Sequence, residues 1–543
     1  DYEHLGEDKH AHYDDEEFWD AEEWEGGAHE RSDDGWVWID AHILCTPVIA
    51  DLDGDGSEEL VVAVSYFYDR EYYDNPAHRA ELGEDLDLSK YIAGGVVVFD
   101  LRRRTVKWSQ HLDLTTDSTQ YRAYTYSAPT VADIDRDGNL EVVLGTSVGF
   151  VYVLSHDGTP REGWPVQMGE IQGQVVAADI NDDGFVELVA ADTRGSVAAF
   201  TWKGKEIWEH HIRSLIAQGP TVGDVDGDGK TEIVIPTSSG SIYVMRGKDG
   251  SPVSPFPYRT HGRIMSPVMI TQLVEGVPQK HLVVSSFDGY LYVVDGKTGC
   301  ADAIDVGETS YSMVLADDLD GNGKLDLVMS TMNGNVYAFE TPMPYSPLIA
   351  WPSQVLSRNG VTARAGWQGI VATPASRSPR DVGGDTLNIQ FEIVDNRPRQ
   401  LIPPSTAAED ERPPSARGPY TVTMHLEGVG PWVMGGEGRI PVAAEVYEKP
   451  GVYELSVPVP RTRAMATVVL EMADEHRMYF TDAFPLSFHV HFYRVLKWVV
   501  VLPFLAMALT LLSLKPAAAA LREHSAPGGL PSYAGPAFRD IPP

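Results

Sequence analysis

Five short acidic segments recur between residues 51 and 326 with one spacing of oxygen-bearing side chains. Asp or Asn stands at positions 1, 3 and 5, Gly at position 6, and Glu or Asp at position 9. Oxygen ligands alternating around a glycine turn are what a Ca²⁺ loop requires, and position 7 would add its backbone carbonyl. The candidate ligands are Asp51, Asp53, Asp55, Glu59, Asp133, Asp135, Asp137, Glu141, Asp179, Asn181, Asp183, Glu187, Asp224, Asp226, Asp228, Glu232, Asp318, Asp320, Asn322 and Asp326.

The composition of these loops favours calcium over other metals, and about five Ca²⁺ sites are expected. Magnesium prefers to keep several waters and takes few protein ligands. Zinc and copper favour His or Cys, which the ligand positions lack. An EF-hand needs flanking helices and a bidentate Glu at position 12. Position 12 is apolar in all five segments: Val62, Leu144, Ala190, Ile235 and Met329. The alternative is a set of acidic β-turns that bind no metal.

The acidic loops lie inside a longer repeat of about 46 residues, the size of a four-stranded propeller blade. Each loop precedes a β-branched run, a Gly-containing turn and a second apolar run, as in residues 142–154 and 233–245. Six units are detectable, and they predict an all-β chain with a six-bladed β-propeller over 35–345; a seventh blade stays open. The strand-like residues 36–39 are expected to complete the last blade.

The fifth unit lacks the acidic ligands. Residues 271–281 read TQLVEGVPQKH, while the strands on either side persist. We therefore expect this blade to fold without an ion.

The loop pattern inside a β-blade resembles the FG-GAP repeats of integrin α-subunit propellers. Longer stretches, such as residues 61–78 and 223–240, closely resemble the Defective in Exine Formation family of plant membrane proteins. This resemblance implies a calcium-binding, single-pass membrane protein of the secretory pathway or cell surface that patterns the pollen wall. For this chain we expect the more general role, which is cell-wall or extracellular-matrix assembly, or adhesion.

The rest of the chain divides into five predicted parts. An acidic segment, 1–34, holds fifteen carboxylates and reads as a disordered tail. After the propeller we expect a linker at 346–383, an immunoglobulin-like β-sandwich at 384–492, a transmembrane helix at 496–515 and a short tail at 516–543.

The expected topology is type I, with the propeller extracellular or luminal at the plasma membrane or an endomembrane. The basis is that five calcium loops suit the millimolar calcium outside the cell or in the secretory lumen better than the calcium level of the cytosol. The chain begins with Asp1, which suggests that a signal peptide has been removed.

Charge and composition restrict the partners. The net charge of −37 argues against nucleic acid, because phosphate binding needs a basic surface. Two cysteines exclude a disulfide scaffold. The membrane and a protein or polysaccharide ligand are the expected partners.

Three functions compete at this point. The first is a non-enzymatic receptor for adhesion or matrix assembly, and the second is a secretory-pathway chaperone or trafficking factor for wall components. The third is a quinoprotein-like enzyme, suggested by tryptophan-containing segments at 96–108 and 197–208. Adjacent cysteines typical of quinone-binding enzymes are missing, and packing between blades also explains the tryptophans. We expect no enzyme.

Overall fold

The computed structural model describes residues 39–68, 75–79, 91–116, 119–346, 348, 368–377, 386–396, 418–427, 440–458, 464–488 and 493–523. Strands dominate this part of the chain, and every described strand pair is antiparallel. The predicted acidic segment 1–34 and the end of the predicted tail, 524–543, lie outside the described residues.

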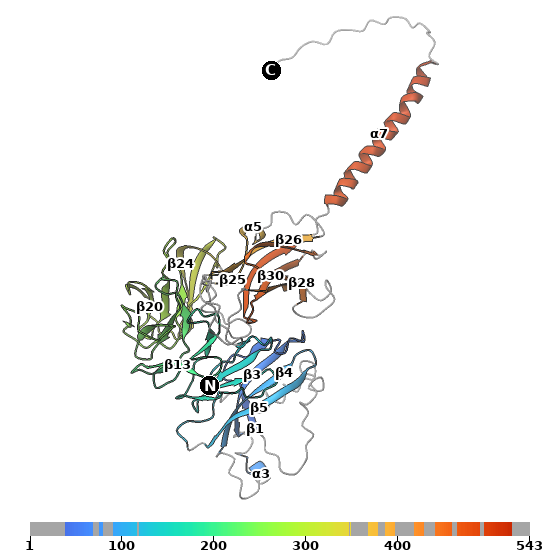
Figure 1. The fold of residues 1–543 in the computed structure, drawn as a ribbon. Helices are drawn as coiled ribbons and strands as arrows, with labels where there is room; N and C mark the ends of the chain where they lie inside the picture. Colours follow the sequence, from blue (N-terminus) through green and yellow to red (C-terminus); the bar gives the residue numbers. More distant parts are fainter. Residues whose placement is uncertain are drawn as a thin grey trace, which may run out of the picture.

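Six consecutive small sheets, called blades 1 to 6, form a propeller-like array (Figure 1). Blade 1 contains β1 (Ile39–His42), β2 (Val48–Ala50), β3 (Glu59–Tyr68), β4 (Tyr91–Asp100) and β5 (Thr105–Thr116), with the short helix α3 (Pro76–Arg79) between β3 and β4. Blade 2 contains β6 (Thr130–Ala132), β7 (Glu141–Gly145), β8 (Phe150–Leu154) and β9 (Val166–Gln167). Blade 3 contains β10 (Val176–Ala178), β11 (Glu187–Ala191), β12 (Ser196–Phe200) and β13 (Glu206–His211).

The last three blades follow the same order. Blade 4 contains β14 (Thr221–Gly223), β15 (Glu232–Pro236), β16 (Ser241–Arg246) and β17 (Tyr258–Arg259). Blade 5 contains β18 (Met269–Thr271), β19 (His281–Ser285), β20 (Tyr290–Asp295) and β21 (Ala301–Asp305). Blade 6 contains β22 (Leu315–Asp317), β23 (Lys324–Ser330) and β24 (Val336–Pro344). Within the described residues no sheet closes on itself.

Side chains between consecutive blades hold the array together. In blades 2 to 5 the strand that follows the loop is buried along its whole length, because a neighbouring blade covers each face. One buried cluster joins Val61 and Val98 of blade 1 to Val142 and Leu144 of blade 2. Apolar residues on both faces of these strands therefore serve the inter-blade core.

Tryptophans add hydrogen bonds between neighbouring blades. Each donates its indole N–H to a carbonyl of the next blade. The pairs are Trp108 with His156 (2.8 Å), Trp164 with Trp202 (3.0 Å) and Trp208 with Gly247 (2.8 Å). Packing between blades thus accounts for the positions of Trp108 and Trp208.

The strand at Ile39 belongs to the first blade. β1 pairs with β3, with Ile39 opposite Tyr68 and His42 opposite Ser65. The expectation that this strand completes the last blade is wrong for Ile39, because the long β3 offers it an edge beyond the short β2. Residues 36–38 lie outside the described part of the chain.

Two further sheets pack face to face as a β-sandwich. One has the order β25 (Gln368–Ala372), β26 (Thr386–Asp395) and β29 (Gly451–Pro458), and α5 (Pro374–Arg377) follows β25. The other has the order β28 (Ile440–Tyr447), β27 (Tyr420–Glu427), β30 (Ala464–Ala473) and β31 (Tyr479–Phe488). Alternating burial along β26 and β31 is typical of strands with one face on a core.

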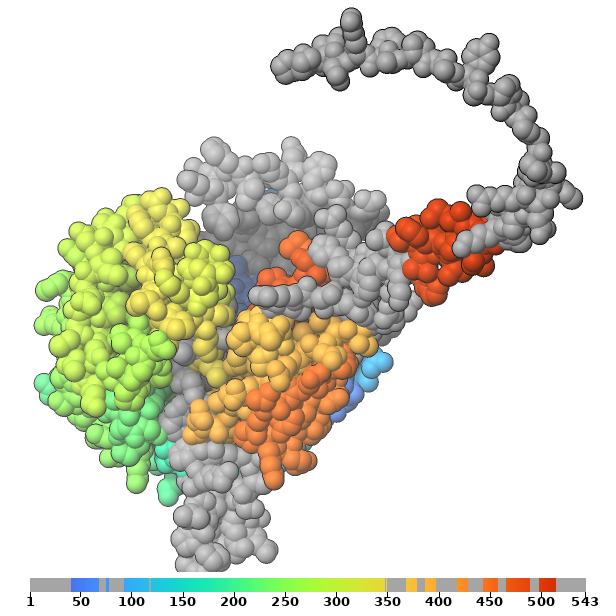
Figure 2. Space-filling view, turned by 90° about the horizontal axis from the view of Figure 1, so that it is seen from above, coloured from blue at the N-terminus to red at the C-terminus, as the bar shows by residue number. Residues whose placement is uncertain are grey.

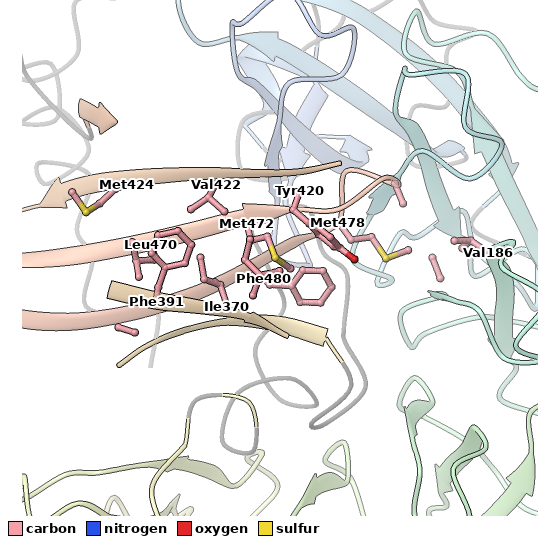
Figure 3. Packing of buried hydrophobic residues seen from close by; sticks show 14 of the residues in the cluster. Val186, Ile370, Phe391, Tyr420, Val422, Met424, Leu470, Met472, Met478 and Phe480 are labelled. Carbon is pink, nitrogen blue, oxygen red and sulfur yellow. The ribbon is translucent and has the colours of Figure 1, made fainter. Parts of the chain in front are cut away.

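The sandwich core contains Ile370 and Phe391 from one sheet and Leu470 and Met472 from the other (Figure 3). Strand β25 lies inside the segment 346–383 that is predicted as a linker. It pairs with β26 from Gln368 to Ala372, so the sandwich begins before residue 384. A five-residue apolar strand is too short to stand out from the Pro- and Ser-rich residues around it.

Helix α7 (Tyr493–Glu523) projects away from the sandwich and the blades (Figures 1 and 2). It continues beyond the predicted end at residue 515 into the predicted tail. Among the described residues, no helix combines the length and the apolar character needed to cross a membrane, so the transmembrane helix predicted at 496–515 is not found.

Candidate metal sites in the acidic loops

Each acidic loop joins two consecutive, paired strands of its blade, as between β2 and β3. Two backbone positions in every loop have positive φ. Position 6 is always glycine, whereas position 4 is glycine in three loops and Arg136 or Asp182 in the others. Left-handed residues twice within three positions turn the chain sharply, and this brings side chains from both ends of the loop together.

The loops gather carboxylates into five clusters. Within each cluster, one ligand atom per residue lies within 4.8 Å of all the others. The clusters are Asp51, Asp53 and Glu59; Asp133, Asp135 and Glu141; Asp179, Asp183 and Glu187; Asp224, Asp226, Asp228 and Glu232; and Asp318, Asp320 and Asp326. The structure therefore brings together most of the predicted ligands.

The remaining predicted ligands lie in the same loops with other contacts. Asp55 and Asp137 accept hydrogen bonds from the backbone N–H of position 7, both at 2.7 Å. Asn181 donates its amide to Asp183 (2.9 Å) and to Glu187 (3.0 Å), and Asn322 donates to Asp320 at 3.0 Å.

Backbone hydrogen bonds fix the first and last ligand of every loop. In blade 4 the N–H of Gly229 donates to Asp224 Oδ2 (3.0 Å), and the N–H of Val225 donates to Glu232 Oε2 (2.9 Å). The same two bonds occur in the other four loops, between the same positions, at 2.8–3.1 Å. One oxygen of each carboxylate is thus held by the backbone. In blades 2, 3 and 4 the second oxygen of the first Asp also accepts a backbone N–H, at 2.8–3.2 Å.

Burial and mutual repulsion make these clusters costly without a cation. Burial, together with the charges of Asp183 and Asp179, raises the pKa of Glu187 to about 9. Burial also raises the pKa of Glu232 to about 8, and the neighbouring Asp226 adds to the shift. A bound cation would reverse this balance, because it favours the ionised carboxylates.

Unpaired buried oxygens test whether the sites fit a cation. Asp51 Oδ1, Asp53 Oδ1, Glu232 Oε1 and Asp318 Oδ1 are buried and accept no hydrogen bond. A buried anionic oxygen without a partner is strongly unfavourable, so such atoms mark the place of a missing positive charge. Since every donor is a hard oxygen and neither His nor Cys contributes, the set fits Ca²⁺.

The fifth blade keeps the hydrogen bond at the last position of the loop, with a histidine in place of the carboxylate. His281 pairs with Thr271, at the place where Asp326 pairs with Asp317 in blade 6, and its Nδ1 accepts the N–H of Leu273 at 3.3 Å. The amide of Gln272 bonds the carbonyls of Val274 (3.1 Å) and Val277 (2.9 Å) within the loop. Among the described residues, no acidic cluster occurs here. Sequence reasoning missed this equivalence because the loop is one residue longer than the others.

The turn between β30 and β31 contacts two of the acidic loops, which the sequence did not predict. His476 Nδ1 lies 2.8 Å from the carbonyl oxygen of Asp133, and the N–H of Asp133 donates to the His476 carbonyl at 3.1 Å. Arg136 donates from Nε to His476 Nε2 at 3.1 Å. Arg477 donates to the carbonyl of Asp51 at 3.3 Å. The sandwich is thereby bound to the loops of blades 1 and 2.

An apolar contact continues this junction towards blade 3. Met478, just before β31, and Val186, in the third loop, belong to one buried cluster with the sandwich core (Figure 3). The sandwich therefore lies against the loop side of blades 1 to 3.

Two family models match the chain. Residues 369–489 match the model described as the DEX1 beta-sandwich. Residues 179–235, which contain the loops of blades 3 and 4, match an FG-GAP-like repeat. The chain therefore carries FG-GAP-like repeats and a DEX1-type sandwich, as the sequence resemblance implies.

Similar curated proteins are two enzymes. A lambda-carrageenase of Pseudoalteromonas carrageenovora is 24% identical over 201 residues, which are 33% of this chain and 20% of the enzyme. A lambda-carrageenase of a Pseudoalteromonas species is 23% identical over the same shares. The match thus spans about a fifth of the length of these relatives.

Among solved structures, the Vibrio cholerae biofilm matrix protein Bap1 is similar at 14% identity, with 82% of this chain and 67% of that chain covered. The TM-score is 0.36, which is too low to carry an argument about function.

Proposed function

We propose that this chain is a calcium-binding protein of the cell surface or the secretory lumen that acts in assembly of the cell wall or extracellular matrix. In this proposal it binds partners and catalyses no reaction of its own. The observation that carries it is the set of five acidic loops with identical backbone hydrogen bonds, on a chain that also matches the DEX1 sandwich. The resemblance implies a role in the pollen wall, and this proposal keeps its general part, the assembly of wall or matrix.

Calcium has a structural role in this proposal. Extracellular loops of this kind typically bind Ca²⁺ with Kd on the order of 10⁻⁴–10⁻³ M. At millimolar calcium each occupied site would then add about 0.4–1.4 kcal/mol to the free energy of unfolding. Several such sites together approach the whole stability of an ordinary domain, about 5–15 kcal/mol. The blades would be rigid where calcium is millimolar and weak where it is scarce.

Membrane attachment through α7 is part of the same proposal. Eleven large apolar side chains between Trp498 and Leu512 are exposed on this helix. Exposed apolar surface of this extent favours contact with lipid. Flotation of the full chain with phosphatidylcholine vesicles, compared with a chain that ends at residue 492, tests this part. If both chains float equally, or neither floats, α7 is not the attachment.

Thermal unfolding of the full chain in 2 mM CaCl₂ and in excess chelator tests the calcium assignment. We expect chelation to lower the Tm strongly, and Asp226→Ala to reproduce a fraction of that loss in calcium. Glu275→Ala, on the exposed part of the blade 5 loop, is the matched control and should leave the calcium response unchanged. Superimposed melting curves with and without calcium would sink the proposal.

Calcium-dependent binding of the labelled protein to isolated wall or matrix material tests the functional part. We expect the bound fraction to fall when chelator is added and when Asp226→Ala is used. Equal binding in all conditions, or none in any, would count against a matrix role.

A further inference from the structure

We infer that the five acidic loops form two classes, because Lys107 and Arg161 are built-in cations that compete with calcium in blades 1 and 2. This inference rests on the proposed calcium function and assigns the five calcium sites to two affinity classes. Blades 3, 4 and 6 are the strong sites, and blades 1 and 2 are weak ones.

In blade 1 a lysine bridges two of the ligands. Lys107 Nζ lies 2.8 Å from Asp53 Oδ2, at position 3, and 2.8 Å from Glu59 Oε1, at position 9. Only 18% of the lysine side chain is exposed, and Glu59 is fully buried. A largely buried ammonium between two carboxylates is held by charge-assisted hydrogen bonds that water weakens little.

Blade 2 reaches the same arrangement with a different residue. Arg161 lies in the turn after β8, and its guanidinium contacts Asp135, at position 3, and Glu141, at position 9, the latter at 2.5 Å. Its side chain is also 18% exposed. Positions 3 and 9 are thus neutralised in both blades, by a residue of β5 in blade 1 and by a residue that follows β8 in blade 2.

The strands explain why Lys107 reaches the loop. β4 and β5 pair Val98 with Trp108 and then Phe99 with Val106, so Lys107 is the extra residue of a β-bulge. Bulges redirect a side chain relative to a regular strand. Blade 3 has the same bulge, since Ala199 pairs with Trp208 and Phe200 with Glu206. The extra residue there is Ile207, which offers no charge to the loop.

The other three loops lack such a cation at position 9. Among the ion pairs of the described residues, none involves Glu187, Glu232 or Asp326. Lys230 approaches the blade 4 loop but contacts only Asp228, and 62% of its side chain is exposed. A solvated contact of this kind competes little with a divalent ion.

Calcium must displace the internal cation before it binds in blade 1 or 2. The two ligand oxygens that Lys107 or Arg161 contacts are ones that a Ca²⁺ ion at positions 1, 3, 5 and 9 would use. Asp51 Oδ1 and Asp53 Oδ1 stay unpaired, so a site persists in blade 1 with lower affinity. We expect the two classes to differ by about tenfold or more in Kd, because a buried, doubly bonded cation has to leave.

The consequence concerns the contact with the sandwich. His476 and Arg477 bind the loops of blades 1 and 2, which carry their own cations. This junction therefore persists at low calcium, while blades 3, 4 and 6 loosen.

Calcium binding to the metal-free full chain, measured by equilibrium dialysis with elemental analysis, tests the inference. We expect three tight and two weak sites in the wild type. Lys107→Met and Arg161→Met should each convert one weak site into a tight one, while Lys230→Met, the matched control, should change neither class. Five equivalent sites that ignore these substitutions would overturn the inference and leave the calcium function intact. No saturable binding would overturn the calcium function itself.

A reciprocal variant covers the case in which Lys107→Met or Arg161→Met fails to fold. Ile207→Lys places a lysine on the equivalent bulge of blade 3, at a side chain that is 36% exposed and so tolerates a charge. We expect it to move one tight site into the weak class. Three tight sites in this variant would contradict the inference.

Discussion

The ring of His476 and the backbone of Asp133 meet across the junction of sandwich and blades, with Nδ1 of the histidine 2.8 Å from the aspartate carbonyl. Both partners are buried, and Arg136 donates to the other ring nitrogen. The ring therefore carries its proton on Nδ1 and accepts at Nε2. One histidine thus fixes the first residue of the blade 2 loop to the sandwich.

Replacing this histidine should weaken the junction. His476→Ala leaves a buried carbonyl and an arginine N–H without partners, which costs about 1–3 kcal/mol. We expect urea denaturation to show lower stability, and limited proteolysis to cut more readily between blades and sandwich. His261→Ala, at an exposed histidine, should behave as wild type. Unchanged unfolding of His476→Ala would show that the junction depends on other contacts.

Two glycines at the same loop position should differ in their tolerance of alanine. Gly54 and Gly321 both stand at position 4, with φ of +73°. Alanine in this left-handed conformation costs about 1–2 kcal/mol at either site. At Gly54 the added Cβ would also lie 2.7 Å from Arg477 Nη2, whereas at Gly321 nothing lies within 4 Å.

We therefore expect Gly54→Ala to lower the Tm more than Gly321→Ala, and only Gly54→Ala to increase proteolysis between blades and sandwich. Melting curves in 2 mM calcium measure the first effect. Equal losses in the two variants would mean that Arg477 moves aside freely.

Removing one buried charge in blade 4 should separate the metal-bound and metal-free states. Glu232→Gln keeps an oxygen for the N–H of Val225 and removes a charge that burial and the neighbouring aspartates disfavour. In chelator we expect its stability to equal or exceed that of the wild type.

In millimolar calcium the same variant should gain less from the ion, by about 0.4–1.4 kcal/mol, the contribution of one site. Calorimetry in both conditions measures the difference. A variant that is destabilised equally with and without calcium would assign Glu232 a purely structural role.

The histidine at the end of the blade 5 loop should make part of the stability depend on pH. Burial lowers the pKa of His281 below its usual value, although Asp295 opposes the shift. The folded state thus favours the neutral ring, whose Nδ1 accepts the N–H of Leu273. This contribution is complete above the unfolded pKa, about 6.5, and is lost as the pH falls towards the folded pKa.

Each pH unit between those two pKa values should cost about 1.4 kcal/mol. His281→Gln removes the titrating group and keeps an acceptor, so its stability should fall less than that of the wild type between pH 7 and pH 5. Denaturation at fixed calcium across this range provides the measurement. Parallel curves for the two proteins would exclude His281 as a source of the dependence.

Local spacing was enough to predict the loops, because their bonds join residues within one turn. Asp224 and Glu232 are the first and last of nine consecutive residues, and their hydrogen bonds to the N–H groups of Gly229 and Val225 follow from the turn itself. The blade repeat followed from the period of its apolar runs, and the sandwich from alternating strands.

The contacts that distinguish one loop from another are long-range and left no local signal. Lys107 is 48 residues from Glu59, and its aim depends on a bulge that the sequence does not reveal. His476 lies in an ordinary-looking polar turn, and nothing near it indicates a partner in blade 2. The sequence did not predict that His281 replaces the last ligand, because one additional residue in its loop moves it out of the repeated spacing.

The separation of Asp133 and His476 along the chain, 343 residues, also orders events during synthesis. At about 5–20 residues per second, the ribosome needs roughly 20–70 s to add the turn after the second loop has appeared. Blades 1 and 2 therefore emerge long before the sandwich can cap them. Lys107 and Arg161 belong to the same blades as the loops they neutralise, so each is available almost as soon as its carboxylates. Nascent blades 1 and 2 thus have their countercharge at hand while they wait for the rest of the protein.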